Sequence, residues 1–336
     1  MMEYRNLGKT GLKISRLGFG GIPIQKTDEA GAKRLMHCLL DAGVNYIDTA
    51  RAYTVSESYI GSALEGIWDQ FILASKSMTK DKDAFARDID ISLQNLRTDY
   101  IDLYQVHNPS LEDLEKFCAP GGVLEALQEA KAAGKIGHIG LTCHSAAVFE
   151  KALDLPWVET VMFPYNIVEN QGEELMQRAK AQNVGFIVMK PLAGGAIDDA
   201  TLALRYILQN DAVSVVIPGM AEEWEIQQNI AACQDQSPLS AGELEKIQTI
   251  RDQLGTNFCR RCNYCAPCSA GISVHNVFLS EGYWKRYGLE SYARSKYDGL
   301  ARHASDCIGC GICETRCPYH LPIRQMLKRI ENLFGY

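Results

Sequence analysis

The strongest constraint on the fold is an alternation of short apolar runs with longer amphipathic segments, repeated eight times between Lys13 and Cys233. The apolar runs have the length of β-strands and lie at residues 15–20, 45–49, 71–75, 100–106, 136–142, 160–164, 185–190 and 214–218. The segments between them have helical periodicity; residues 28–42, for example, place Leu35, Met36 and Leu39 on one stripe. Strands that are apolar on both faces indicate a parallel sheet covered by helices.

Two α/β architectures are compatible with this alternation. Eight units in about 220 residues predict a closed (β/α)8 TIM barrel, because typical barrels have roughly 250 residues. The alternative is an open, doubly wound sheet, which would carry a glycine-rich phosphate loop after its first strand. The segment at 18–21, GFGG, lacks the full G-x-G-x-x-G spacing, so the barrel is favoured.

Eight of the twelve cysteines lie in two short runs near the C-terminus. They are Cys259, Cys262, Cys265 and Cys268, and then Cys307, Cys310, Cys313 and Cys317. The second run has the spacing C-x2-C-x2-C-x3-C-P, the ligand pattern of bacterial two-cluster ferredoxins. Structural zinc sites generally use two separated C-x2-C pairs, so we predict two [4Fe–4S] clusters rather than two zinc ions.

The spacing leaves open which cysteines share a cluster. In a crossed arrangement the last cysteine of each run binds the cluster of the other run, which is the most economical assignment. It groups Cys259, Cys262 and Cys265 with Cys317, and Cys307, Cys310 and Cys313 with Cys268. An uncrossed arrangement is the alternative, because the first run ends in C-x2-C rather than C-x3-C.

The chain is therefore expected to have two domains, a barrel at 1–255 and an iron–sulfur domain at 256–336. Residues 240–254 form a linking helix, and the broadly helical stretch at 274–303 indicates a small, mainly helical cluster domain. A net charge of −7 gives no indication of binding to nucleic acid or to an anionic membrane surface. No apolar run reaches the length of a membrane span, and thiolate clusters favour a reducing compartment, so we expect a cytoplasmic protein.

Polar side chains follow several of the predicted strands. Barrel enzymes carry their reactive groups at the carboxyl ends of strands, and here these positions hold Asp48, Tyr53, Lys76 and His107. A tyrosine has a pKa of about 10, which a neighbouring lysine ammonium lowers. An aspartate can hold that lysine in place, and a histidine can orient a carbonyl oxygen.

Six segments in order resemble the aldo-keto reductase family. The stretch LGKTGLKISRLGFGG at 7–21 is similar to the family's N-terminal β-hairpin. The others are NYIDTARAY (45–53), ILASK (72–76), DYIDLYQVH (99–107), GKIGHIGLT (134–142) and VIPG (216–219). The match covers nearly all of residues 3–255, and the whole chain resembles the branch with a C-terminal 4Fe–4S domain.

The resemblance implies a catalytic tetrad of Asp48, Tyr53, Lys76 and His107. Tyr53 would be the general acid, Lys76 would lower its pKa, Asp48 would anchor Lys76, and His107 would position the carbonyl of a small substrate. The resemblance also implies NAD(P)H as a cofactor, with contacts expected at Thr142, His144, Met162, Lys190, Gly219 and Asn229.

Several of these cofactor positions depart from the family pattern. The usual serine and asparagine after strand five are replaced by Thr142 and either Cys143 or His144, and the usual glutamine on strand six is replaced by Met162. After strand eight, where NADP-dependent members grip the 2′-phosphate with basic residues, this chain has Gly219 and Glu225. A carboxylate there would repel a phosphate, so NAD is favoured over NADP.

Electron counting suggests a further alternative. Hydride transfer moves two electrons at once and iron–sulfur clusters move one, so a flavin is the alternative carrier. The favoured hypothesis is an oxidoreductase acting on a carbonyl or alcohol, with clusters that relay electrons to a ferredoxin-like partner. The alternatives are an electron-transfer or redox-sensing protein with an inactive or flavin-adapted barrel, and clusters that are purely structural.

Overall fold

The computed structural model describes residues 2–255 and 257–336, which divide into two compact units. The barrel unit consists of Met1–Asn166, Asn170–Pro191 and Asp199–Leu239. The cluster unit consists of Ile167–Glu169, Leu192–Asp198 and Ser240–Tyr336.

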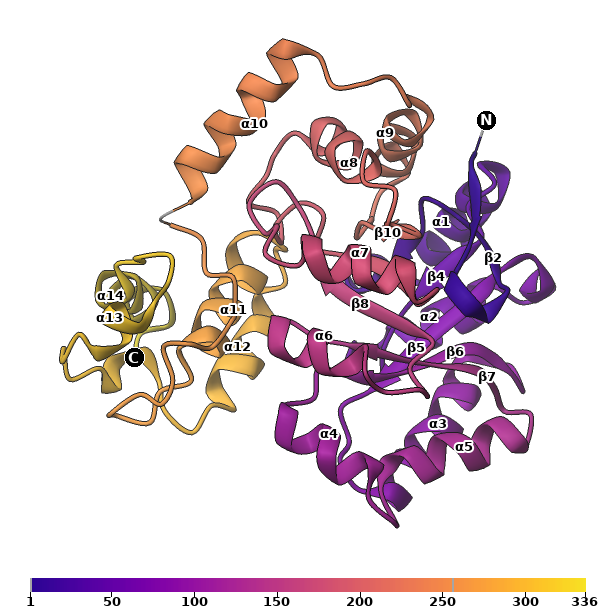
Figure 1. Ribbon diagram of the computed structural model, residues 1–336, viewed down its shortest axis with the longest axis horizontal. Coiled ribbons are helices and arrows are strands. Elements are labelled where there is room, and N and C mark those ends of the chain that lie inside the picture. The colour runs from indigo at the N-terminus through magenta and orange to yellow at the C-terminus, as the bar shows by residue number, and fades with distance from the viewer. Residues whose placement is uncertain (1, 256) are drawn as a thin grey trace. The chain divides into compact units, whose positions relative to one another are not determined.

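Eight parallel strands form the sheet of the barrel unit (Figure 1). In chain order they are β3 (Phe19–Gly20), β4 (Tyr46–Asp48), β5 (Ile72–Ser77), β6 (Ile101–His107), β7 (Ile136–Thr142), β8 (Thr160–Pro164), β9 (Gly185–Met189) and β10 (Val215–Ile217). Each strand pairs with the next one in sequence, and parallel bridges from Leu17 to Val216 and from Gly20 to Gly219 close the barrel. The predicted (β/α)8 barrel is confirmed.

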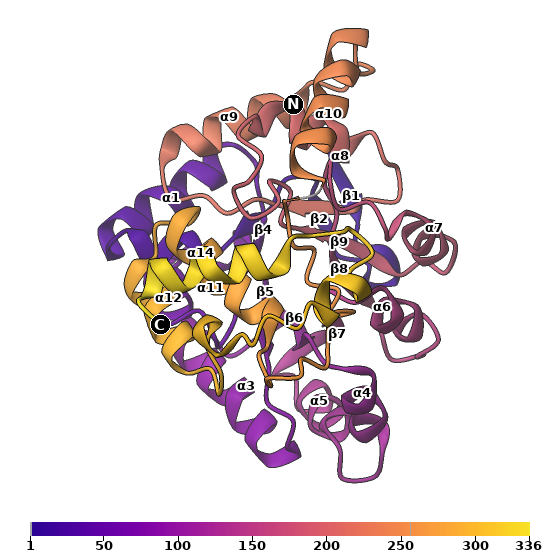
Figure 2. The same cartoon turned by 90° about the vertical axis from the view of Figure 1, so that its left-hand side faces the viewer.

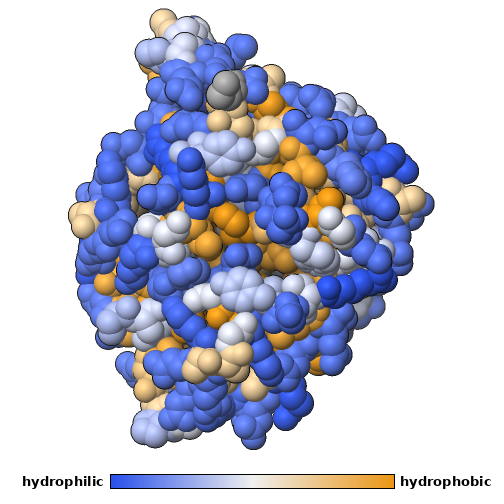
Figure 3. Space-filling view, turned by 90° about the vertical axis from the view of Figure 1, so that its right-hand side faces the viewer, coloured by the Kyte–Doolittle hydropathy of each residue, from blue (hydrophilic) through white to orange (hydrophobic). Residues whose placement is uncertain are grey.

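Helices follow each strand and cover the outside of the sheet (Figure 2). They are α1 (Glu29–Asp41), α2 (Ser56–Ala63), α3 (Lys82–Leu96), α4 (Leu111–Cys118), α5 (Val123–Ala132), α6 (Ala146–Ala152), α7 (Glu173–Ala181), α8 (Ala200–Leu208) and α9 (Glu223–Gln234). On the face shown in Figure 3 hydrophilic residues predominate, with apolar residues visible between them. No helix in the described part of the chain is long and apolar enough to span a membrane.

A two-stranded antiparallel hairpin precedes the barrel and contributes to its interior. It consists of β1 (Tyr4–Asn6) and β2 (Lys13–Ser15). Leu7 and Ile14 from this hairpin belong to one buried cluster with inward-facing strand residues that include Leu103 and Ile187. The hairpin therefore fills the end of the barrel with apolar side chains, as expected for a packed core rather than a pore.

The cluster unit is helical, as predicted. It contains α10 (Ala241–Leu254), α11 (Val274–Lys285), α12 (Glu290–Asp298), the short α13 (Ile312–Arg316) and α14 (Ile323–Phe334). Apolar residues recur along one face of α14 and are buried with Val277, Phe278 and Tyr297. The rings of Tyr297 and Phe334 stack with their centroids 4.0 Å apart. Cys313 and Cys317 are buried in the same core.

The division into units differs in two ways from the expected boundary at residue 255. Compactness places α10 in the cluster unit, and it assigns to that unit the short loops that follow β8 and β9. Within the cluster unit, Arg260 Nε donates to the carbonyl oxygen of Val168 at 2.9 Å, and Arg286 Nε donates to that of Gly194 at 2.8 Å. Arg261 forms a buried ion pair with Glu169 at 3.0 Å.

A partly buried carboxylate joins β7 to the start of β8. Glu159 accepts hydrogen bonds from the Lys131 ammonium, from the ring of His138 and from the backbone N–H of Ile139, at 2.7 to 3.0 Å. Burial by itself would raise the pKa of Glu159, but these donors together lower it to about 2. Because the folded pKa lies below the unfolded value of about 4.3, Glu159 stabilises the fold above that value and loses this contribution as the pH falls toward 2.

We expect Glu159→Gln to lower the free energy of unfolding at pH 7 by about 1–3 kcal/mol, because it removes a charge-assisted network. Denaturant unfolding from pH 7 down to pH 2 should show a constant difference between the two proteins above about pH 5, and a shrinking difference between about pH 4.3 and 2, as first the unfolded and then the folded Glu159 becomes protonated. A difference that stays constant over this range would contradict the assignment of the low pKa to Glu159.

Candidate active site and cluster-binding cysteines

The four residues of the predicted tetrad come from three adjacent strands. Asp48 ends β4, Lys76 lies near the end of β5 and His107 ends β6, while Tyr53 lies in the loop after β4. Because these strands pair in parallel, their carboxyl ends lie at one edge of the barrel. The ring of Tyr53 meets that of His107 edge-on, with centroids 6.0 Å apart.

Lys76 is fully buried. Its ammonium group contacts a carboxylate, a backbone carbonyl oxygen and an aromatic ring. It forms an ion pair with Asp48, donates to the carbonyl oxygen of Thr49 at 2.7 Å, and lies 5.0 Å from the centroid of the Tyr53 ring. Burial lowers the pKa of Lys76, and the Asp48 carboxylate opposes that fall. A charged Lys76 beside Tyr53 favours the phenolate form of the tyrosine.

Asp48 is held on both of its oxygens. Its Oδ1 faces Lys76, and its Oδ2 accepts a hydrogen bond from Gln105 Nε2 at 3.0 Å. Burial raises the pKa of Asp48, whereas Lys76 and Gln105 lower it. Gln105 is therefore part of the site, although it was not among the predicted site residues. Because alternate residues of a strand share a face, its position two residues before His107 on β6 already indicated that it lies on the same face.

A second buried carboxylate lies behind the tetrad, at the start of α2. Glu57 accepts hydrogen bonds from Ser75, Ser92 and Asn95 at 2.7 to 3.1 Å, and its Oε2 pairs with Arg51 Nη1 at 2.5 Å. The backbone N–H of Arg51 donates to the carbonyl oxygen of Lys76 at 3.0 Å. Arg51 thus connects this network to the loop that carries Tyr53.

The expected cofactor contacts divide into positions at the carboxyl edge and positions in the core. His107, Thr142 and Met162 are register partners on β6, β7 and β8. Thr142 Oγ1 accepts the backbone N–H of Asn108, whose side chain meets His144 Nδ1 at 3.1 Å. Met162 is buried in the barrel interior and is not exposed at the edge. Thr142 therefore lies beside His107, whereas Met162 lies one strand further from the tetrad.

The remaining positions lie at the ends of β9 and β10. Lys190 follows β9 in a left-handed backbone conformation, and its carbonyl oxygen accepts a hydrogen bond from Asn166. A Cβ on Gly219 would lie 2.5 Å from Pro23 Cγ, so only glycine fits there. Asn229 is buried on α9.

Glu225 caps the start of α9, a role that its charge alone does not indicate. Its Oε2 accepts the backbone N–H groups of Ala221 and Glu222 at 2.6 and 3.0 Å, so it belongs to the capping box of α9. The Glu225 carboxylate therefore already occupies these two N–H groups. An anion that approached the start of α9 would meet this negative charge.

One set of cysteines gathers around Cys259. Burial raises the pKa of Cys259 to about 11, with further contributions from the charges of Cys262 and Cys317. Burial likewise raises the pKa of Cys265 to about 12, with contributions from Cys259, Cys262 and Cys313. These interactions require proximity, so Cys259 and Cys262 lie near Cys317, whereas Cys265 lies near Cys259, Cys262 and Cys313.

The other set surrounds a small cavity lined by Cys268, Cys307, Cys310 and Cys313. Two contacts join the runs here. Cys310 Sγ lies 3.9 Å from Ser269 Oγ, and Arg316 donates to the carbonyl oxygen of Pro267 at 3.0 Å. In residues 2–255 and 257–336, no three cysteine, histidine or carboxylate side chains are placed to share one metal ion. A four-iron cluster takes one thiolate at each iron, so this donor set fits such a cluster.

The fold and these residues define a barrel oxidoreductase that carries a cysteine-rich, cluster-binding region. The chain belongs to the aldo/keto reductase family, whose sequence model matches residues 16–201 and 197–252. A second model, of a 4Fe-4S dicluster domain, matches residues 258–322. Both halves of the predicted resemblance are confirmed.

Named relatives match the barrel part of the chain. L-galactose dehydrogenase of Arabidopsis thaliana is 26% identical over 303 residues, which cover 74% of this chain and 94% of the relative. Aldo-keto reductase YhdN of Bacillus subtilis is 33% identical over 217 residues, with coverage of 58% and 64%. The holo structure of aldo-keto reductase AKR11C1 from Bacillus halodurans has a TM-score of 0.66 and 28% identity, and covers 74% of this chain and 96% of its own.

The Glu57 network predicts an unequal effect of two ion-pair mutations. We expect Arg51→Met to lower the free energy of unfolding by about 2–4 kcal/mol, because it leaves the buried Glu57 carboxylate without its cation. Lys180→Met removes a cation from an exposed pair with Asp211 and should cost about 0.5 kcal/mol or less. Chemical denaturation of both variants measures this difference, and equal losses would show that Glu57 does not depend on Arg51.

Proposed function

We propose that the barrel interconverts a carbonyl group and the corresponding alcohol of a small molecule. We further propose that two [4Fe–4S] clusters relay electrons between the protein and a ferredoxin-like partner. The observation that carries the first part is the buried Asp48–Lys76 pair next to the ring of Tyr53. A buried ion pair adjacent to a tyrosine is suited to tuning one proton donor, because it fixes a positive charge beside the phenol.

The proton chemistry follows from this arrangement. A nicotinamide, when bound, supplies the hydride that reduces the carbonyl carbon. Tyr53 donates its hydroxyl proton to the carbonyl oxygen, and Lys76 stabilises the phenolate that remains. His107, whose ring lies edge-on to Tyr53, orients the same oxygen. In the oxidative direction the Tyr53 phenolate takes the proton back from the alcohol.

The expected choice between nicotinamides rests on the start of α9. Glu225 already occupies the backbone N–H groups of Ala221 and Glu222, so a 2′-phosphate near this point would be repelled. This supports NAD over NADP.

We also propose crossed ligation of the clusters. One cluster would be held by Cys259, Cys262, Cys265 and Cys317, and the other by Cys268, Cys307, Cys310 and Cys313. The cavity lined by the second set supports this grouping, as do the two contacts that join residues next to Cys268 to the second run.

Paired cysteine substitutions separate the two ligation schemes. With crossed ligation, Cys259→Ala with Cys317→Ala removes two ligands of one cluster and leaves the other complete, so about four of roughly eight irons should remain. Cys259→Ala with Cys268→Ala should instead damage both clusters. Iron analysis and electron paramagnetic resonance after anaerobic reconstitution measure the result, and the opposite pattern would establish uncrossed ligation.

Tyr53→Phe tests the barrel chemistry. We expect it to lower kcat for carbonyl reduction by at least a hundredfold, because general acid catalysis contributes about 10²–10⁴ in rate, while cluster content stays unchanged. Assays use a panel of small aldehydes and ketones with NADH and NADPH, and the cluster absorbance is followed in the same anaerobic samples, with dithionite as the reference.

The outcomes distinguish the candidate functions. Loss of turnover in Tyr53→Phe with intact clusters supports the enzyme, and better turnover with NADH supports the assignment at α9. Bleaching of the clusters by NADH would show that nicotinamide electrons reach them. If wild type turns over none of the panel but its clusters exchange electrons, the barrel is a scaffold or binds a flavin, and the proposal for the barrel fails.

A further inference from the structure

Cys310 differs from the other seven cysteines of the two runs because it alone is exposed. Two residues away on either side lie isoleucines that are exposed as well. The accessible fraction of Ile308 is 69% and that of Ile312 is 39%. The two isoleucines therefore give the surface next to Cys310 an apolar character.

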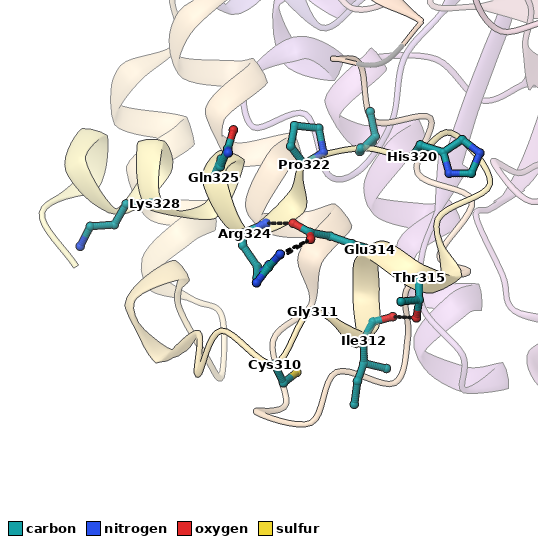
Figure 4. A pocket seen from close by; sticks show the side chains of 11 residues that line it. Cys310, Gly311, Ile312, Glu314, Thr315, His320, Pro322, Arg324, Gln325 and Lys328 are labelled. Atoms are coloured by element: carbon teal, nitrogen blue, oxygen red, sulfur yellow. Dashed lines mark hydrogen bonds and ion pairs between the residues drawn. The ribbon is translucent and has the colours of Figure 1, made fainter.

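A groove begins at Cys310 and runs between α13 and α14 (Figure 4). Arg324 on α14 pairs with Glu314 on α13 at 2.8 Å and also donates to the carbonyl oxygen of Gly309. Lys328 lies one turn further along α14, and its side chain points away from the loop (Figure 4). We call Ile308, Cys310, Ile312, Arg324 and Lys328 the Cys310 face.

The charge of this region is opposite to that of the whole chain. Residues 302–331 contain five arginines or lysines and three aspartates or glutamates, whereas the whole chain has a net charge of −7. Arg324 pairs with Glu314 and Lys328 pairs with Glu331, but half or more of each basic side chain stays exposed. A partner of negative charge would therefore meet exposed cationic side chains on α14.

We propose that the Cys310 face docks a small, acidic one-electron carrier protein; the inference rests on the relay function proposed above. The step transfers one electron between the cluster held by Cys268, Cys307, Cys310 and Cys313 and the carrier. One of the two is oxidised by one electron and the other is reduced by one, and no bond forms or breaks. Complexes of this kind are small, transient and electrostatically steered.

The charge of the cluster itself fixes how the carrier would sit. Four thiolates bring negative charge to the loop around Cys310, so acidic residues of the carrier would meet Arg324 and Lys328 on α14. The edge of the carrier's cofactor would then meet Ile308 and Ile312, which are uncharged. The orientation thus depends on one basic and one apolar contact region.

The test uses the full chain with reconstituted clusters and two probes under anaerobic conditions. Flavodoxin is the acidic carrier and cytochrome c is the basic control. Calorimetry gives the Kd of each oxidised probe, which is a readout independent of turnover, and stopped-flow absorbance gives the rate of electron exchange after reduction by dithionite. Both are measured at about 50 and 500 mM salt.

Three single variants are compared. We expect Lys328→Glu and Ile308→Ser each to weaken flavodoxin binding and slow electron exchange at least fivefold at low salt, with no change in iron content. Lys246→Glu makes the same charge reversal on an exposed position of α10 and should have no effect. High salt should weaken binding to wild type and reduce the difference made by Lys328→Glu.

The results separate this proposal from the relay function. Electron exchange that is unaffected by Lys328→Glu and Ile308→Ser would overturn the docking face while leaving the relay intact. Preference for cytochrome c, or self-association of the chain through this face in sedimentation, would also overturn it. Clusters that dithionite reduces but that exchange electrons with neither probe would overturn the relay itself, and the docking face with it.

Discussion

The ion pair between Lys76 and Asp48 is the interaction on which the site depends. Both groups are buried, and an isolated charge in such a place would be strongly destabilised. The structure meets this cost with further partners, the Thr49 carbonyl oxygen for Lys76 and the Gln105 amide for Asp48. Because those partners come from β4, its following loop and β6, the pair forms only when neighbouring strands are correctly aligned. Assembly of the proton donor thus depends on the alignment of β4, β5 and β6.

Most of the fold was predictable from the sequence. Strands with two apolar faces and helices with one apolar stripe differ clearly in period, so the ranges of β7 and β8 were predicted to the residue. Between β6 and β7 the sequence predicted one helix, at 122–133, whereas the structure also has α4, with a capping box of Ser110 and Asp113 at its start. A capping box spans only four residues, and the eight residues of α4 are too few for hydrophobic periodicity to indicate a helix. The place of α10 among the units was also unpredictable, because compactness depends on contacts between distant segments.

The site was predictable only in part, and the reason is physical. Tyr53 and Lys76 follow strands and belong to a familiar motif, so their positions could be expected. Glu57 looks like an ordinary polar residue of an amphipathic helix, and only the fold shows that four donors surround it. Glu225 was interpreted through its charge alone, whereas its carboxylate is also engaged in capping α9. The grouping of cysteines depends on how two separated runs meet, which spacing along the chain does not determine.

The contacts of the segment from Cys259 to Cys262 decide whether the cysteine region can be removed without altering the rest of the chain. Its two middle residues, Arg260 and Arg261, bind Val168 and Glu169 in the loop that follows β8. A shortened chain that ended after α10 would leave the Glu169 carboxylate without this guanidinium. Domain dissection of this chain, by truncation or by grafting the cysteine region elsewhere, therefore changes the loop after β8 as well as removing iron ligands. The loop after β8 and the cysteine region therefore belong to one compact unit, although separate sequence models match them.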